Sequence, residues 1–170
     1  MAIKILILGL LENNPSHPYE MKQRLQQHGW DQIFSLTDGN LYHATRQLRK
    51  HEYIQAVKNE KNNKRPSRTI YQITAAGFEH LQKSILEVFQ QRRDEAKALY
   101  PALLYIHLVP IEPVKQAIQT WIEELEMVER QHNKLKGSIP ELIADHYISH
   151  HQFQKNWLGR VQQVLEEGKL

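Results

Sequence analysis

Apolar residues recur at helical spacing in three short segments over the first fifty residues of the chain. The first segment covers residues 3–11 and stops at the Asn-Asn-Pro of residues 13–15. The second opens at the Ser-His-Pro of residues 16–18, where a capping side chain precedes a proline of the first turn, and closes at Gly29. Its residues expected to face the core are Tyr19, Met21 and Leu25. With a third segment at residues 39–50, the pattern predicts three short helices in a row.

The third predicted helix has two faces of different character. At about 100° per residue, one side is apolar and suits a protein core: Leu41, Ala44 and Leu48. The other side is polar and cationic: Tyr42, His43, Arg46, Gln47 and Lys50. Thr37 or Asp38 is placed to cap the helix. Side chains of these types hydrogen-bond to base edges and phosphates, so the helix is a candidate for a DNA groove, although an ordinary surface helix also has a polar face.

The period changes from helical to extended after Leu48. Residues 53–58 and 68–73 are rich in β-branched and aromatic side chains and are predicted as strands. Residues 59–67 between them form a polar loop with turn formers and a cluster of cations. Three helices followed by a hairpin with a basic tip are typical of a winged helix-turn-helix, in which the hairpin is the wing.

Helical character resumes at Thr74 and continues to the end of the chain, interrupted by prolines. The predicted helices cover residues 75–91, 94–108, 112–136 and 141–167. The last two carry broad apolar stripes, and a short turn at residues 136–140 folds them into an antiparallel pair. A second copy of the chain is the natural cover for these stripes, so a homodimer is expected. The predicted fold class is mainly α (α+β), with a winged helix-turn-helix at residues 1–80 and a helical dimerisation domain at residues 81–170.

Charge and cysteine content limit the kinds of partner and site. Residues 1–70 hold eleven Lys and Arg against six Asp and Glu, whereas residues 71–170 hold eleven against thirteen. The basic N-terminal part suggests an anionic partner, either nucleic acid or a membrane surface. The absence of cysteine excludes disulfides and cysteine-based metal sites, which fits the cytoplasm, and no cofactor is indicated. The apolar run at residues 3–11 is too short to span a membrane, and no membrane partner is expected.

Four ordered motifs carry a resemblance to a known family. They are Leu-Gly-Leu-Leu at residues 8–11, Pro-Ser-His-Pro-Tyr-Glu-Met at 15–21, Gly-Asn-Leu-Tyr at 39–42, and Arg-Pro-Ser-Arg-Thr-Ile-Tyr-Gln-Ile-Thr-Ala-Ala-Gly at 65–77. With these motifs the chain resembles the PadR family of bacterial transcriptional regulators. The tail is similar to that of the longer members, in which an Arg-Asp-Glu like residues 93–95 precedes a helical hairpin and a Trp-Leu like residues 157–158 lies in the last helix.

Three positions depart from the family pattern. His43 stands where the family usually has a proline, Glu52 replaces a glycine near the end of the recognition helix, and Pro18 occupies the glycine position of a His-Gly-Tyr motif. Glu52 leaves the turn into the wing without the residue that adopts a left-handed conformation most readily. None of the changes removes a cation, so we expect DNA binding to be retained with an altered sequence preference.

The resemblance implies that the helix beginning at Thr37 enters the major groove. Its residues placed toward base edges are Asn40, His43 and Gln47, and those toward phosphates are Tyr42, Arg46 and Lys50. Arg46 is also able to reach a guanine, and Tyr42 is alternatively a half-buried packing residue. Four cations of the wing are expected to contact the DNA backbone or the neighbouring minor groove: Lys61, Lys64, Arg65 and Arg68. Alternatively, they belong to a solvated loop that makes no such contact. A dimer then reads an inverted repeat with half-sites roughly 10 bp apart.

The same resemblance implies that the helical tail dimerises the protein. It also implies that binding of a small-molecule effector, phenolic or drug-like, changes the affinity of the protein for DNA. The candidates for an aromatic effector pocket, which are alternatively core residues, are Tyr100, Tyr105, Trp121, Tyr147, His150 and Trp157. His146 and His150 lie four residues apart beside Asp145 and His151, a spacing that can hold zinc or nickel. Without a third ligand at a fixed distance, no metal site is predicted.

The sequence thus predicts a ligand-responsive, DNA-binding regulator of transcription, in the first place a repressor. An activator or co-activator of the same family is an alternative that the sequence does not separate from a repressor. A winged helix that docks an acidic protein is a second alternative, and a weak dependence of binding on salt would favour it. The chain shows no activated nucleophile, glycine-rich phosphate loop or pair of carboxylates at a telling spacing, so enzymatic activity is not expected.

Overall fold

The computed structural model describes residues 2–34, 36–62, 65–130 and 139–169 of the chain. Side chains are described within these ranges except at residues 2, 31, 59–62, 65–67 and 129–130. The chain packs into two compact units. The winged-helix unit comprises Met1–Val88 and Glu95–Val109, and the helical-hairpin unit comprises Phe89–Asp94 and Pro110–Leu170. The division into two functional domains at residue 80 stays a prediction.

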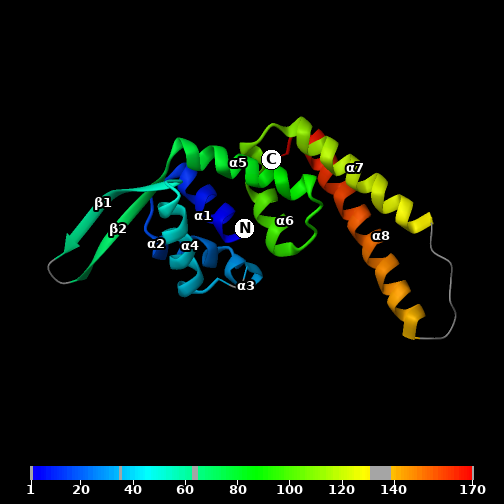
Figure 1. Cartoon of the computed structure of the whole chain (residues 1–170), viewed down its shortest axis with the longest axis horizontal. Coiled ribbons are helices and arrows are strands. Elements are labelled where there is room, and N and C mark those ends of the chain that lie inside the picture. The colour runs from blue at the N-terminus through cyan, green and yellow to red at the C-terminus, as the bar shows by residue number, and fades with distance from the viewer. Residues whose placement is uncertain (1, 35, 63–64, 131–138, 170) are drawn as a thin grey trace. The chain divides into compact units, whose positions relative to one another are not determined.

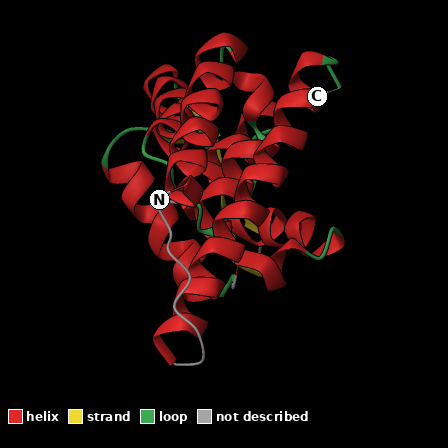
Figure 2. Cartoon of the chain, turned by 90° about the vertical axis from the view of Figure 1, so that its right-hand side faces the viewer, coloured by secondary structure: helices red, strands yellow, loops and turns green. Residues whose placement is uncertain are grey.

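Helices make up most of the chain, with one two-stranded antiparallel sheet, which confirms the predicted fold class (Figure 1, Figure 2). The elements up to the wing are α1 (Ala2–Asn13), α2 (Pro18–Gln27), α3 (Trp30–Phe34), α4 (Asp38–Lys50), β1 (Ile54–Asn62) and β2 (Arg65–Ile73). The later elements are α5 (Ala75–Gln90), α6 (Ala96–Leu104), the 3-10 helix η1 (Ile106–Leu108), α7 (Ile111–Arg130) and α8 (Ile139–Glu166). No helix in the described ranges is long and apolar enough to cross a membrane.

A short helix that the sequence pattern did not predict, α3, lies in the chain between α2 and the two-faced helix α4. It has only five residues, too few to show a helical repeat. Gly29, with a φ of 69°, separates α3 from α2, so α2 ends where the sequence predicted. The expectation that Tyr19 faces the core was wrong: it is half exposed, because it lies about 200° around α2 from the buried Met21.

Helix α1 forms the centre of the winged-helix unit. Residues 5–8 and Leu11 are buried, and α1 contacts α4, α6 and β2. The ring of Tyr105 lies directly against Gly9 of α1, where an added Cβ would overlap the ring. Burial in this core raises the pKa of Tyr105 to about 12. The single helix predicted at residues 94–108 is divided at Tyr105 into α6 and η1.

The strands of the wing are longer than predicted. Residues 54–62 of β1 pair with residues 65–73 of β2, so most of the loop predicted at residues 59–67 is strand. Strand pairing uses main-chain N–H and C=O groups, which polar residues provide as well as apolar ones. Because the prediction relied on polar composition, it ended β1 too early and began β2 too late. Residues 63–64 at the tip lie outside the described part of the chain.

Both strands of the wing are fixed to the helices at their base. Ser16, in the connection between α1 and α2, exchanges main-chain hydrogen bonds with Tyr71 of β2, with N–O distances of 2.9 and 3.1 Å. Just before β1, the Tyr53 carbonyl accepts a hydrogen bond from Thr74 N at 3.0 Å. The Thr74 hydroxyl donates to the Glu52 carbonyl at 2.8 Å. These contacts tie β1 and β2 to the segments that precede α2 and α5.

Glu52 has a φ of 59°, in the left-handed region, as expected where the family pattern has glycine. We predict that Glu52→Gly raises the free energy of unfolding by about 1 kcal/mol, because glycine adopts this conformation without the Cβ penalty. Urea unfolding followed by far-UV circular dichroism measures the change. The control is Glu79→Gly on the exposed side of α5, which should lower the free energy of unfolding by roughly 0.5–1 kcal/mol. Equal effects of the two substitutions would contradict the prediction.

The helical-hairpin unit pairs α7 with α8, as the apolar stripes predicted (Figure 1). The buried apolar side chains are Val114, Ile118, Trp121 and Leu125 of α7, with Leu158 and Leu165 of α8. Arg92 adds a polar contact, donating from Nη2 to Glu124 Oε1 of α7 at 2.6 Å. Part of the predicted turn at residues 136–140 lies outside the described residues.

Candidate nucleic-acid interface

The start of α4 is fixed by a capping box. The Thr37 hydroxyl oxygen accepts a hydrogen bond from Asn40 N at 3.2 Å, and the Asn40 Oδ1 accepts one from Thr37 N at 3.0 Å. This confirms Thr37 as the cap among the two candidates. The carboxamide oxygen of Asn40, predicted to contact a base edge, is engaged in this cap.

Helix α4 has the two faces that the sequence predicted. The side chains of Leu41, Ala44 and Leu48 are buried in the core of the winged-helix unit. On the other side, Tyr42, His43, Arg46 and Lys50 are exposed, and Gln47 is partly exposed. Thr45 is also buried, which its polarity did not suggest, because its hydroxyl donates to the Leu41 carbonyl at 2.9 Å. With Arg49, which is also exposed, α4 therefore presents one tyrosine, one histidine and three cations to solvent.

Helix α2 and its N-cap residue His17 make two contacts with α4 that the sequence pattern did not indicate. Lys22 Nζ lies 2.8 Å from Asp38 Oδ1, an ion pair that joins α2 to the first turn of α4. The rings of His17 and Tyr42 meet edge to face, with centroids 6.3 Å apart. Both contacts join residues at least sixteen positions apart in the chain, so no local pattern could have indicated them.

His17 caps α2 and lies close to a cation of the wing. Its Nδ1 accepts from Tyr19 N at 3.1 Å, and its own N–H donates to Glu20 Oε2 at 3.0 Å. Desolvation and the nearby positive charge of Arg68 lower the pKa of His17, against an opposing effect of Glu20. A neutral ring keeps Nδ1 free to accept the capping hydrogen bond. Arg68 of β2 thus lies near the same surface as Tyr42.

The remaining wing cations are described only in part. Lys61 and Arg65 lie on β1 and β2, but their side chains are outside the described residues, as is the whole of Lys64. Their contact with DNA stays a prediction. We define the α4 face as the surface formed by His17, Tyr42, His43, Arg46, Gln47, Lys50 and Arg68.

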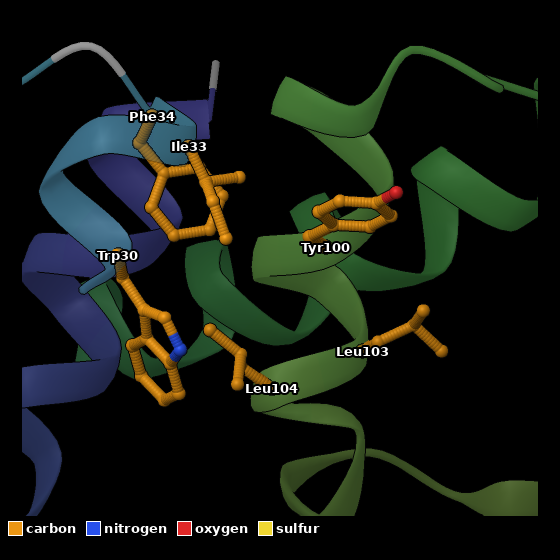
Figure 3. Close-up of a pocket in the computed structure, with 6 residues that line it drawn as sticks. All are labelled: Trp30, Ile33, Phe34, Tyr100, Leu103 and Leu104. Atoms are coloured by element: carbon orange, nitrogen blue, oxygen red, sulfur yellow. The ribbon is translucent and has the colours of Figure 1, made fainter. Parts of the chain in front are cut away.

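The predicted effector residues do not lie together in one unit. Tyr100 of α6 lines a cavity of the winged-helix unit (Figure 3). Trp121, Tyr147, His150 and Trp157 lie on α7 and α8 of the helical-hairpin unit. Trp121 is buried, whereas Tyr147 is 45% exposed. Whether any of these residues binds an effector stays a prediction.

The histidines of α8 make contacts of their own. His150 Nε2 lies 3.3 Å from Asp94 Oδ2, and the rings of His146 and His150 are parallel with centroids 6.5 Å apart. Among the residues that the structure describes, no three His, Cys, Asp or Glu side chains are grouped so that they could hold a metal ion.

Comparison with known families gives a match to the N-terminal part of the chain. Residues 7–83 match the model of the transcriptional regulator PadR-like family. This range runs from α1 into α5 and includes α4 and the wing. No curated protein matches the sequence.

The comparison with solved structures gives matches of low sequence identity. The chain is similar to Bacillus subtilis PadR in complex with operator DNA, with 15% identity and a TM-score of 0.48 over 96% of this chain and 99% of that chain. For the same protein in complex with p-coumaric acid the identity is 13% and the TM-score 0.40, over 98% and 99%. For a PadR family transcription regulator from hypervirulent Clostridium difficile the values are 20% and 0.45, over 55% and 93%.

Proposed function

Because this chain belongs through its winged helix to the PadR-like family of transcriptional regulators, we propose that it binds operator DNA as a homodimer and represses transcription. The observation that carries the proposal is the α4 face, where polar and cationic side chains of α4 are exposed to solvent. The opposite side of the same helix is buried in the core. A protein that acts on operator DNA works in the bacterial cytoplasm.

In this proposal α4 enters the major groove and the wing follows the neighbouring backbone. His43 and Gln47 are directed to base edges, and Lys50 and Tyr42 to phosphates. Arg46, exposed near the middle of the helix, reaches a guanine or a phosphate. Asn40 has its oxygen in the cap, so it supports the start of α4 in addition to any contact of its amide group.

We predict that Arg46→Ala lowers operator affinity by about 10- to 100-fold, because a good contact of arginine with DNA is worth about 1–3 kcal/mol. The operator is first isolated from genomic fragments selected by binding to the protein. Electrophoretic mobility shift at two or more salt concentrations then gives the affinity and its salt dependence. Loss of one phosphate contact would also lower the slope of log affinity against log salt by about one.

The matched control is Lys83→Ala on α5, which removes an exposed cation that lies outside the α4 face. It should leave operator affinity within about twofold of wild type, since its charge is screened from the DNA by distance. Equal losses in the two variants would argue against α4 as the recognition helix. Binding that is weak and insensitive to salt would favour the alternative of a protein-interaction module.

The exposed apolar stripe of α8 supports the dimer. Leu142, Phe153 and Val164 are 64%, 66% and 43% exposed and follow one another at intervals of eleven residues. Eleven residues are close to three helical turns, so the three side chains lie on one side of α8. Ile139 and Ile143, also exposed, continue the same stripe at its start. We define these five residues as the α8 stripe, and a second copy of the chain is the occupant that buries it.

We propose further that a small-molecule effector releases the repressor from its operator. An effector shifts operator affinity only by its different affinities for the free and the DNA-bound protein. Transcription in vitro from a template with the operator tests the sign of regulation. A fall in transcript on addition of the protein supports a repressor, and a rise supports the alternative of an activator.

A further inference from the structure

Three aromatic side chains from separate segments of the chain stack at the base of the wing. They are His51, which caps the C-terminus of α4, Tyr53, which directly precedes β1, and His80 of α5. The centroid of the Tyr53 ring lies 4.2 Å from that of His80 and 5.9 Å from that of His51. We define these three rings as the base stack. We infer that the base stack holds the base of the wing closed at neutral pH, and that uptake of a proton by His80 loosens it in acid.

The main chain of Tyr53 joins the helices to the wing. Its N–H donates to the Leu48 carbonyl of α4 at 3.0 Å, and its carbonyl accepts from Thr74 N, just before α5, at 3.0 Å. The same carbonyl lies so close to Gly77 of α5 that an added Cβ would overlap it. The end of α4, the start of β1 and the start of α5 therefore meet at one residue. A change that displaces the Tyr53 ring acts on all three.

The contact between Tyr53 and His80 suits two neutral rings. The rings are nearly parallel, with an angle of 10° between their planes, and His80 is partly buried. Stacking in this way removes the flat faces of both rings from water. A protonated imidazole in the same place would lose part of its hydration, which disfavours the charged form. Attraction of the cation to the face of the tyrosine offsets only part of this loss if other positive charges are close.

The charges around His80 are mostly positive. Desolvation, followed by the charge of Lys4 in α1, lowers the pKa of His80 below the ordinary histidine value of 6.5. His51 of the base stack and Lys83, one turn along α5, lower this pKa further. Only Glu87 among these groups raises it, and its carboxylate also pairs with Lys83 Nζ at 3.9 Å. Protonation of His80 therefore places a further positive charge beside Lys4, Lys83 and His51.

The direction of this shift determines how the base of the wing responds to pH. When the base opens, His80 is exposed to water and regains its ordinary pKa, so the open state binds more protons than the closed state. The contribution of His80 to stability is therefore complete above its ordinary pKa of 6.5 and is lost as the pH falls below this value. For a single histidine, the opening equilibrium changes by at most about tenfold between pH 7.5 and pH 5.5.

Hydrogen exchange of single amides in the full-length protein, followed by NMR, measures the opening. The probe is the N–H of Thr74, whose hydrogen bond to the Tyr53 carbonyl closes the base of the wing. After correction for intrinsic exchange, its protection factor in the wild type should fall by about threefold or more from pH 7.5 to pH 5.5. His80→Phe keeps a ring in the base stack but cannot take up a proton, so its fall should be smaller than that of the wild type by about twofold or more. Tyr53→Leu removes the shared ring and should lower protection at pH 7.5 by about fivefold or more.

His107→Phe is the matched control. His107 is an exposed histidine of the same unit, and its ring also lies near a tyrosine, with centroids 6.4 Å apart for Tyr105 and His107. This variant should show the wild-type fall in protection. A pH titration of the ring protons of His80 gives a second readout, with a midpoint expected below 6.5 that rises in Lys4→Met.

Circular dichroism and urea unfolding establish that the variants are folded, and His80→Gln replaces His80→Phe if the latter is not. An equal fall in protection in the wild type and in the His80 variant would overturn the inference, as would a His80 midpoint at or above 6.5. Unchanged protection of Thr74 in Tyr53→Leu at pH 7.5 would show that the base stack does not hold the wing. Because every measurement is made without DNA, these outcomes are independent of the proposed function.

Discussion

Replacement of Gly77 by alanine is expected to unfold the winged-helix unit under conditions in which the wild-type protein is stable. Gly77 lies in the first turn of α5, where an added Cβ would overlap the main-chain carbonyl oxygen of Tyr53. The same Cβ would lie 2.8 Å from the Tyr53 carbonyl carbon and 3.0 Å from Ile73 Cγ1. Main-chain atoms cannot rotate away as a flexible side chain can, so α5 or the start of β1 has to move.

That movement disturbs several contacts at once, because the Tyr53 carbonyl also accepts the hydrogen bond from Thr74 N. We expect Gly77→Ala to lower the free energy of unfolding by about 3 kcal/mol or more. Urea unfolding followed by circular dichroism measures the loss. Gly39→Ala is the control, since its Cβ would come no closer than 3.9 Å to Thr37 Oγ1 and alanine favours helix, so stability should rise by up to about 1 kcal/mol. A wild-type unfolding midpoint for Gly77→Ala would contradict the close approach of α5 and Tyr53.

Two negative charges introduced on the α8 stripe are expected to convert the proposed dimer to a monomer that binds the operator only weakly. Leu142→Glu with Phe153→Glu places carboxylates at two side chains that are 64% and 66% exposed in one chain. In a dimer that buries the stripe, these charges would be desolvated without partners, which opposes association. A monomer binds one half-site only, so operator affinity should fall about 100-fold or more.

Analytical ultracentrifugation measures the mass, and mobility shift measures the affinity. The control is Gln152→Glu with Asn156→Glu, which adds the same charge at exposed positions of α8 outside the stripe. This variant should remain a dimer with nearly wild-type affinity. A dimer in the stripe variant, or a wild-type monomer that binds the full operator, would disprove the role of the stripe.

Apolar spacing predicted most of the fold because the core of this protein is helical. The buried side of α4 and the pairing of α7 with α8 follow from residues three, four and seven positions apart, which periodicity detects. Helix α3 was not predicted because its five residues form little more than one turn, which is too short to show a helical repeat. The outer half of the wing escaped it because main-chain pairing, and not side-chain type, decides how far a hairpin extends.

For the candidate site, the sequence predicted the residues that share one helix but not the contacts between helices. The exposed residues of α4 could be read from one helix. The ion pair of Lys22 with Asp38 and the ring contact of His17 with Tyr42 depend on how α2 crosses α4, which a single sequence does not reveal. The cavity has the same origin, since only folding brings Trp30 of α3 next to Tyr100 and Leu104 of α6.

The base of the wing, tied to the helices through Ser16 and Thr74, has a mechanical consequence for the operator. In the proposed complex with DNA, α4 and the root of the wing keep a fixed separation, so a mismatch between this separation and the spacing of the grooves would be absorbed by the DNA. Bending or narrowing of a groove then contributes an elastic energy that depends on the base steps involved. Flexible pyrimidine–purine steps between the contacted base pairs would lower this energy, and base pairs that no side chain touches would thereby influence the choice of operator.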